Sequence, residues 1–248
     1  MAVAVVLVGG LATTAVLLTT SRQPAPSQAL PPVRPSVIPT GAPPTTTPPP
    51  KPPTLLPVLA VKIDNVGPAR PQTGIGAADV VYVELVEGGL TRLLAVYSSH
   101  LPPAIGPVRS ARRTDLDLLA QYGRPTLAYS GAAAQILALL HDAPLTNASP
   151  AEAGGAYYRG GSRPAPHNLY VRPARLPVAT TPPPTTLQSG PPPPGGTPTT
   201  TQRVIYPAAF YDFTWSAGPG RWLVSMDGTP DVTTDSGQLT AATVVIER

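Results

Sequence analysis

The chain has 248 residues, a formal net charge of +4 and only 12% charged side chains, which is sparse for a soluble globular domain. It contains 37 prolines and no cysteine, and the missing thiols exclude disulfides, thiolate metal sites, a cysteine nucleophile and a lipidated cysteine. The mild positive charge says little about nucleic acid. Basic and aromatic residues alternate only around 157–159, so we expect no nucleic-acid partner.

An uncharged, apolar segment opens the chain. Residues 2–18 are apolar enough to cross a bilayer core of about 30 Å as a helix that rises about 1.5 Å per residue. We therefore expect residues 1–21 to be a transmembrane anchor, with the lipid bilayer as partner through residues 2–18. The alternative is a cleaved signal peptide, because Ser27-Gln28-Ala29 resembles a cleavage site.

The orientation of this anchor is not simple. Arg22 follows the apolar segment and no basic residue precedes it, so the positive-inside rule taken literally would keep the rest of the chain in the cytoplasm. We expect a basic stretch further upstream in the natural protein. The prediction is a single-pass protein of the cell membrane with an extracytoplasmic folded part, or a secreted protein if the signal is cleaved.

Two proline-rich tracts divide the remainder. Residues 22–57 combine proline with threonine, serine and alanine, a composition that cannot bury a core and favours an extended, disordered linker. Residues 173–201 form a second such linker. The predicted folded parts are therefore residues 58–172 and the short segment 202–248.

The first folded part predicts alternating strands and helices. Apolar, β-branched runs at 79–87 and 90–99 flank Gly88-Gly89 and indicate a β-hairpin. Ser110 is the expected cap of a helix that ends at Gly123. The other expected elements are strands at 58–64 and 125–130, a helix at 111–122 and a short buried helix at 132–141. We expect an α+β fold class, with 202–248 as a small, mostly β domain that ends before its last strands.

Carboxylates and arginines around the hairpin turn are the candidate functional residues. Glu87 lies at the mouth of the turn, where a carboxyl could serve as a general acid; pairing with Arg92 or Arg109 is the more frequent use of such a residue. Arg109, Arg112 and Arg113 flank the expected start of a helix, a natural place for a phosphate or carboxylate. Arg112 and Arg113 point to different helix faces, so one of them meets only solvent.

Several weaker motifs carry no prediction of chemistry. "TGIGAA" at 73–78 has Asp79 where a dinucleotide fingerprint needs its third glycine, so we expect no cofactor. Ser130 lacks the flanking glycines of a hydrolase nucleophile and is expected to cap the next helix. The three histidines are too scattered for a metal site, and His167, in "APHNLY", is the one that could take part in acid-base chemistry.

Three stretches together carry a family resemblance: "VKIDNVGPARPQTGIGAADVVYVELVEGGLTRLLAVY", "IGPVRSAR" and "PHNLY". They resemble the domain of unknown function of YerB-like bacterial cell-envelope lipoproteins, over residues 58–172. Residues 203–248 are similar to the first part of that family's C-terminal domain. The resemblance implies an extracytoplasmic, membrane-tethered, two-domain protein, without a transferable reaction. Its recurrent polar positions correspond here to Asp64, Asn65, Arg70, Pro71, Glu87, Arg92, Arg109, Arg112, His167 and Asn168.

We therefore expect a tethered module that binds a wall-associated glycan, peptide or anionic polymer through a polar cleft. The expected binding residues are Asp64, Asn65, Arg70, Arg92, Arg109, Arg112 and Asn168, and the expected catalytic residues are Glu87 and His167. The alternative is a peptidoglycan-acting hydrolase or lyase with Glu87 as general acid. A third reading has the same residues only bracing the hairpin against the helix.

Overall fold

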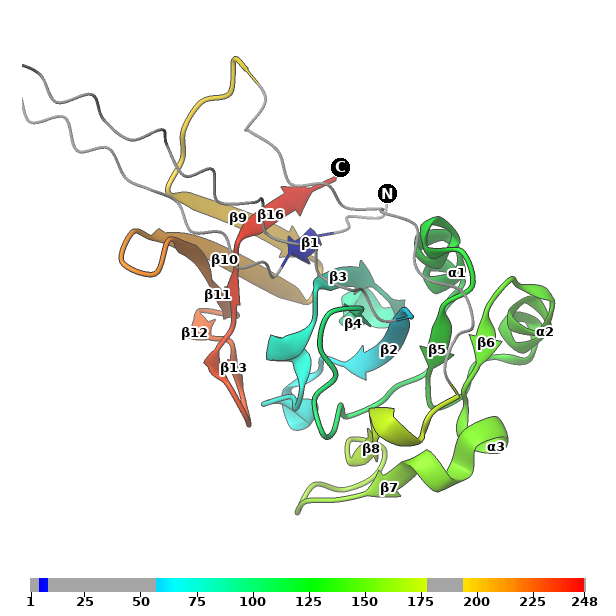
Figure 1. Ribbon diagram of the computed structural model, residues 1–248. Helices are drawn as coiled ribbons and strands as arrows, with labels where there is room; N and C mark the ends of the chain where they lie inside the picture. The colour runs from blue at the N-terminus through cyan, green and yellow to red at the C-terminus, as the bar shows by residue number, and fades with distance from the viewer. Residues whose placement is uncertain (1–4, 9–56, 178–193, 248) are drawn as a thin grey trace, which may run out of the picture. The chain divides into compact units, whose positions relative to one another are not determined.

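The computed structural model describes residues 5–8, 57–177 and 194–247, and the account below concerns these residues. The main sheet has seven strands in the order β16-β1-β3-β4-β2-β5-β6 (Figure 1). A second sheet has the order β12-β11-β10-β9, with β15 also paired to β11, and the pairs β13-β14 and β7-β8 complete the β-structure. The α+β fold class predicted from sequence is confirmed.

The bounds of the elements follow the apolar runs of the sequence. The strands are β1 (Val5–Val8), β2 (Leu59–Asp64), β3 (Val80–Leu85), β4 (Thr91–Tyr97), β5 (Thr126–Ala128), β6 (Thr146–Asn147), β7 (Tyr157–Arg159), β8 (Leu169–Val171), β9 (Thr201–Tyr206), β10 (Ala209–Ser216), β11 (Arg221–Met226), β12 (Thr229–Pro230), β13 (Val232–Thr233), β14 (Gly237–Gln238), β15 (Thr240–Ala241) and β16 (Thr243–Ile246). The α-helices are α1 (Arg113–Leu119), α2 (Ala134–Asp142) and α3 (Pro150–Ala153).

The predicted hairpin forms β3 and β4, which pair antiparallel from Val80↔Val96 to Leu85↔Thr91. Strand β2 pairs antiparallel with β4 on one side and parallel with β5 on the other. Because side chains alternate across a strand, each of these strands presents one apolar row to each face of the sheet. The sheet is therefore covered on both faces.

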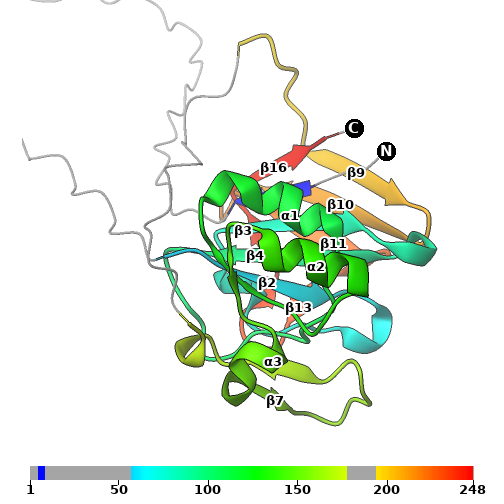
Figure 2. The same ribbon diagram turned by 90° about the vertical axis from the view of Figure 1, so that its right-hand side faces the viewer.

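Helices α1 and α2 cover one face of the main sheet (Figure 2). Val58, Ala60, Leu94 and Val96 pack there, and Leu119 of α1 contributes from the helix side. Helix α1 begins at Arg113 with Arg112 as its cap position, where the Asp115 carboxylate accepts a hydrogen bond from the Arg112 backbone N–H at 2.6 Å. The predicted Ser110 cap was wrong, because Asp115 closes the helix end from within its first turn.

Helix α2 was correctly placed but wrongly predicted to be buried. Leu140 packs inward, whereas Leu137 and Leu139 are exposed. The helix lies at the surface and turns only one stripe toward the sheet. Ser130 does not cap it, because the cap position is Ala133 and the Ser130 N–H instead binds the Arg109 carbonyl at 3.0 Å.

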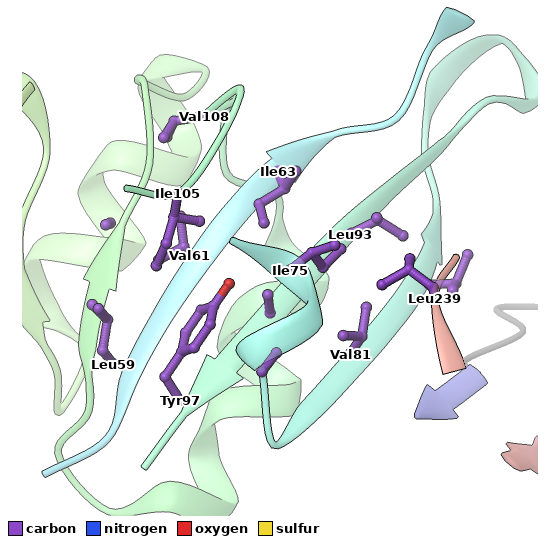
Figure 3. Packing of buried hydrophobic residues seen from close by; sticks show 14 of the residues in the cluster. Leu59, Val61, Ile63, Ile75, Val81, Leu93, Tyr97, Ile105, Val108 and Leu239 are labelled. Carbon is purple, nitrogen blue, oxygen red and sulfur yellow. The ribbon is translucent and has the colours of Figure 1, made fainter. Parts of the chain in front are cut away.

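The other face of the sheet forms a larger core (Figure 3). Val61, Ile63, Leu93 and Tyr97 project into it and meet segments that have little regular structure. The second sheet adds a further row of buried side chains to the same cluster: Val204, Tyr206, Tyr211, Phe213, Val224 and Met226. The C-terminal strands thus bury their apolar residues against the main sheet, as so short a segment requires.

The glycines of "TGIGAA" have a packing role. Gly74 adopts φ +80°, and a Cβ on it would overlap the Ala104 carbonyl oxygen. A Cβ on Gly76 would overlap the Ser236 hydroxyl. Close approach of neighbouring segments accounts for both glycines.

The predicted anchor lies mostly outside the described residues. Its part that the structure describes, Val5–Val8, is a strand that pairs with β3 and β16, so the expectation of helix is not met there. β-Branched valines suit a pleated strand as well as an apolar helix, which explains why composition alone did not separate the two. No helix within the described ranges has the length and apolar character needed to span a bilayer.

Candidate functional site: an arginine cluster at the end of the main sheet

A backbone segment held across the ends of two strands positions the candidate site. The Asp64 N–H donates to the Pro107 carbonyl, and the Arg109 N–H donates to the Lys62 carbonyl, both at 2.8 Å. On the other side, the Arg109 carbonyl accepts from the Ser130 N–H at 3.0 Å. Residues 107–111 are therefore fixed between the ends of β2 and β5, and the arginines in this segment start from a rigid backbone.

Arg92 and Arg112 meet at one carbonyl oxygen. Arg92 on β4 donates to the Ser110 carbonyl at 2.9 Å, and Arg112 donates to the same oxygen at 3.4 Å. Arg112 also makes a two-pronged contact with Glu87, with Nε at 3.0 Å and Nη2 at 2.7 Å from Oε2. The hairpin turn and the start of α1 are joined by this pair.

Asp64 is the centre of a second group of contacts, next to the group at the Ser110 carbonyl. Its side chain is only 2% exposed, and its Oδ2 lies 2.9 Å from Nδ1 of His167 and 3.1 Å from Nε of Arg109. The Arg109 contact is an ion pair without hydrogen-bond geometry. The His167 side chain is 19% exposed, so part of it is accessible to solvent.

Arg92 is coupled electrostatically to both groups of contacts. Burial lowers the pKa of its guanidinium, and the charges of Arg112 and Arg109 lower this pKa further, while Asp64 and Glu87 raise it. These five side chains therefore share one electrostatic field, with three guanidiniums and two carboxylates. A positive group that is both desolvated and flanked by like charges favours an added anion.

A buried ion-pair triad lies beneath the cluster. Nζ of Lys62 is 2.6 Å from Glu84 and 2.7 Å from Asp115, and all three side chains are almost completely buried. Thr114 donates a further hydrogen bond to Glu84. Burial and the nearby Asp115 charge raise the pKa of Glu84 to about 7, against the opposing effect of Lys62. The triad joins β2, β3 and α1, and so holds together the strands and the helix start that surround the arginine cluster.

Three of the predicted binding residues lie elsewhere. Asn65 is buried and donates to Thr91 at 2.9 Å and to Tyr211. Arg70 pairs with Asp227 of the β11–β12 turn at 3.0 Å. Asn168 braces its own loop. Its side chain accepts from Arg159 at 2.6 Å and donates to the Arg163 carbonyl at 2.9 Å.

The geometry weighs against Glu87 as a general acid. Its side chain is 70% exposed and its hydrogen bonds from Arg112 lower its pKa. A general acid needs the reverse, a carboxyl that burial keeps protonated near neutral pH. The pairing of Glu87 with an arginine was anticipated, but the partner is Arg112 instead of Arg92 or Arg109.

Sequence reasoning missed the triad, and a signal for it was present. Lys62 is a single charge within the otherwise apolar run VLAVKI, and such a lysine must be paired if the strand is central. In the strand register, Arg92 of β4 lies opposite Glu84 of β3 on one side of β4 and opposite Asp64 of β2 on the other side. No sequence pattern pointed to Asp115, because this residue is far from Lys62 in the sequence and only the fold brings the two side chains together.

Comparison with known proteins gives both a similar solved structure and a matching family. The structure is similar to the crystal structure of YerB from Bacillus subtilis, with a TM-score of 0.61 and 21% sequence identity over 75% of this chain and 67% of that one. The profile of the family "Protein of unknown function (DUF3048) N-terminal domain" matches residues 43–182. The chain belongs to this family, and the YerB-like resemblance is confirmed.

A stretch of 54 residues is 50% identical to a Bacillus subtilis (strain 168) protein named "Putative lipoprotein YerB". It covers 22% of this chain and only 16% of that relative. The similarity is therefore strong but local.

Proposed function

We propose that this protein is a tethered envelope module that binds an anionic component of the cell wall through Arg92, Arg109 and Arg112. The observation that carries the proposal is the meeting of Arg92 and Arg112 at the Ser110 carbonyl, with Arg109 next to it in the chain. Guanidinium groups bind phosphate and carboxylate through paired hydrogen bonds. Two carboxylates against three guanidiniums leave this field positive, which an anionic ligand would compensate.

The place of action in the proposal rests on the relative and on the N-terminal sequence. The relative carries the name "Putative lipoprotein YerB", which supports an association with the membrane or envelope. The proposal requires that Val5–Val8, which pair with β3 and β16, leave the main sheet so that residues 2–18 can attach the chain to a bilayer. The proline-rich residues 22–57 would then act as an extended spacer that carries the arginine cluster to polymers at some distance from the membrane.

A pair of adjacent arginines provides the test. The probe is a synthetic poly(glycerol phosphate), with neutral dextran as the uncharged control, titrated into the protein by calorimetry. A hydrogen bond to a charged group contributes about 1.5–3 kcal/mol, so Arg112→Gln should weaken binding roughly 10- to 100-fold. Arg113→Gln removes the same charge from the next, exposed residue and should leave affinity nearly unchanged.

Stability measurements separate binding from bracing. Arg112 pairs with a largely exposed carboxylate, and such pairs contribute about 0–1 kcal/mol to stability. The melting temperature of Arg112→Gln should therefore stay close to that of the parent while polymer binding is weakened. Equal polymer binding by the Arg112→Gln and Arg113→Gln proteins, or a large loss of stability with unchanged affinity, would refute the proposal.

A hydrolytic role is the second proposal, favoured by the contact of His167 with buried Asp64 at 2.9 Å. A histidine oriented by a buried carboxylate can act as a general base, and nearby guanidiniums can stabilise a developing negative charge. This proposal places the base at His167 and leaves Glu87 to hold Arg112. His167→Gln should then reduce the release of soluble fragments from purified peptidoglycan at least 100-fold. Unchanged release by the His167→Gln protein, or no release by the parent protein, would exclude the hydrolytic role.

A further inference from the structure

A cavity away from the arginine cluster holds a buried carboxylate. It has a volume of about 280 Å³ and lies between the segment after β2 and the β11–β13 region. Its lining combines three charged side chains with apolar ones: Gly67, Arg70, Pro71, Met226, Asp227, Thr229, Pro230, Asp231 and Val232. None of the side chains proposed for anion binding belongs to this lining.

Asp231 is the unusual member of this lining. It is only 6% exposed, and its side-chain oxygens have no hydrogen-bond or ion-pair partner among the described residues. Its backbone is fixed, since its N–H binds the Val224 carbonyl and its carbonyl binds the Leu239 N–H. A buried carboxylate without a partner is costly, and it would be stabilised by a ligand that brings a positive charge.

The surrounding charges do not neutralise Asp231. Arg70 is engaged by Asp227 at 3.0 Å, and the charges of both side chains act on the Asp231 carboxyl in opposite directions. Tyr211 is a further titratable group near Asp231; burial raises the pKa of the Tyr211 hydroxyl, and the charge of Asp231 helps to raise it further. Burial raises the pKa of Asp231 to about 6, so the carboxyl is ionised at neutral pH and neutral below this value.

We propose that this cavity binds a primary ammonium group on a short aliphatic stem, with Asp231 pairing with the ammonium and Met226, Pro230 and Val232 contacting the stem. An amine matches the single unpartnered carboxylate. The described residues offer no group of three acidic or histidine ligands for a metal ion. The apolar part of the lining favours an alkyl chain over a small hydrated cation.

The probe is n-pentylammonium, observed by NMR on the full chain with 13C-methyl-labelled methionine. Met226 lines the cavity, so its methyl signal should shift on binding. We expect saturable binding that is at least tenfold tighter than that of n-pentanol or n-pentanoate. Lowering the pH from 7 to 5 should weaken it about tenfold, because about one carboxyl in ten stays ionised one unit below its pKa.

Two substitutions complete the test. Asp231→Asn should weaken pentylammonium binding at least tenfold, whereas Asp117→Asn, on the exposed face of α1, should not change it. Equal binding of pentylammonium and pentanol, or preference for pentanoate, would overturn the proposal, and so would full affinity in Asp231→Asn. If the Asp231→Asn variant does not fold, the comparisons with pentanol, with pentanoate and between pH 7 and pH 5 on the parent protein still test the proposal. Failure here leaves the polymer titration with Arg112 unaffected.

Discussion

Replacement of Lys62 by methionine is the sharpest test of how the arginine cluster is supported. Methionine preserves most of the volume of the side chain but removes the ammonium that lies 2.6 Å from Glu84 and 2.7 Å from Asp115. Two carboxylates would then remain buried next to each other. Removing one partner of a buried ion pair typically costs about 3–5 kcal/mol, a large part of a total stability of about 5–15 kcal/mol.

The pH dependence of this loss has a definite sign. With Lys62 present, the pKa of Glu84 is already raised from 4.5 to about 7. Stability from this group is therefore fully present below pH 4.5 and falls by about 3 kcal/mol as the pH rises through 7. Without the ammonium, the pKa of Glu84 should rise further, so the destabilisation by Lys62→Met should be largest at pH 8 and smaller at pH 5.

Calorimetric or circular-dichroism melts at pH 5 and pH 8 measure this difference. For a domain of this size, 3–5 kcal/mol corresponds to a fall in melting temperature of roughly 6–20 °C. Adding Glu84→Gln to Lys62→Met should restore part of the loss at pH 8, because one of the two unpaired charges is removed. A loss below about 1 kcal/mol at pH 8, or a loss that is the same at both pH values, would refute this account of the triad.

Two further predictions concern backbone geometry and a buried charge. Gly74→Ala should lower the free energy of unfolding by at least about 2 kcal/mol, since φ is +80° and the new methyl would overlap the Ala104 carbonyl; Gly67→Ala, with open space around it, is the control and should be nearly neutral in urea titrations. Asp231→Asn should stabilise the protein by up to about 3 kcal/mol at pH 8, because burial raises the pKa of this carboxyl from 3.8 to about 6. The stability cost of Asp231 appears as the pH rises through 6 and is absent below 3.8, so the gain should vanish at pH 3.5; a gain of the same size there would mean that ionisation is not its cause.

The main strands and helices could be predicted because local pattern and local structure agree. The double glycine between two β-branched runs forms the β3–β4 hairpin, and Gly123 follows the helical stretch that begins with α1. In each case the residues that determine the element lie within a few positions of one another. Burial was less predictable, as α2 shows, because exposure depends on what packs against the helix.

The grouping of the candidate residues was decided only by the tertiary structure. Asp64, Arg109 and His167 are all recurrent polar positions, yet the sequence does not show that two of them share the carboxylate of the first. Neither does it show that Arg70 lies apart, beside Asp227, or that Asp231 is buried without a partner. Charged side chains pair across long separations along the chain, and which pairs form depends on the three-dimensional path of the backbone. Composition and motifs therefore determined the class of the protein, while the fold decided which charges meet.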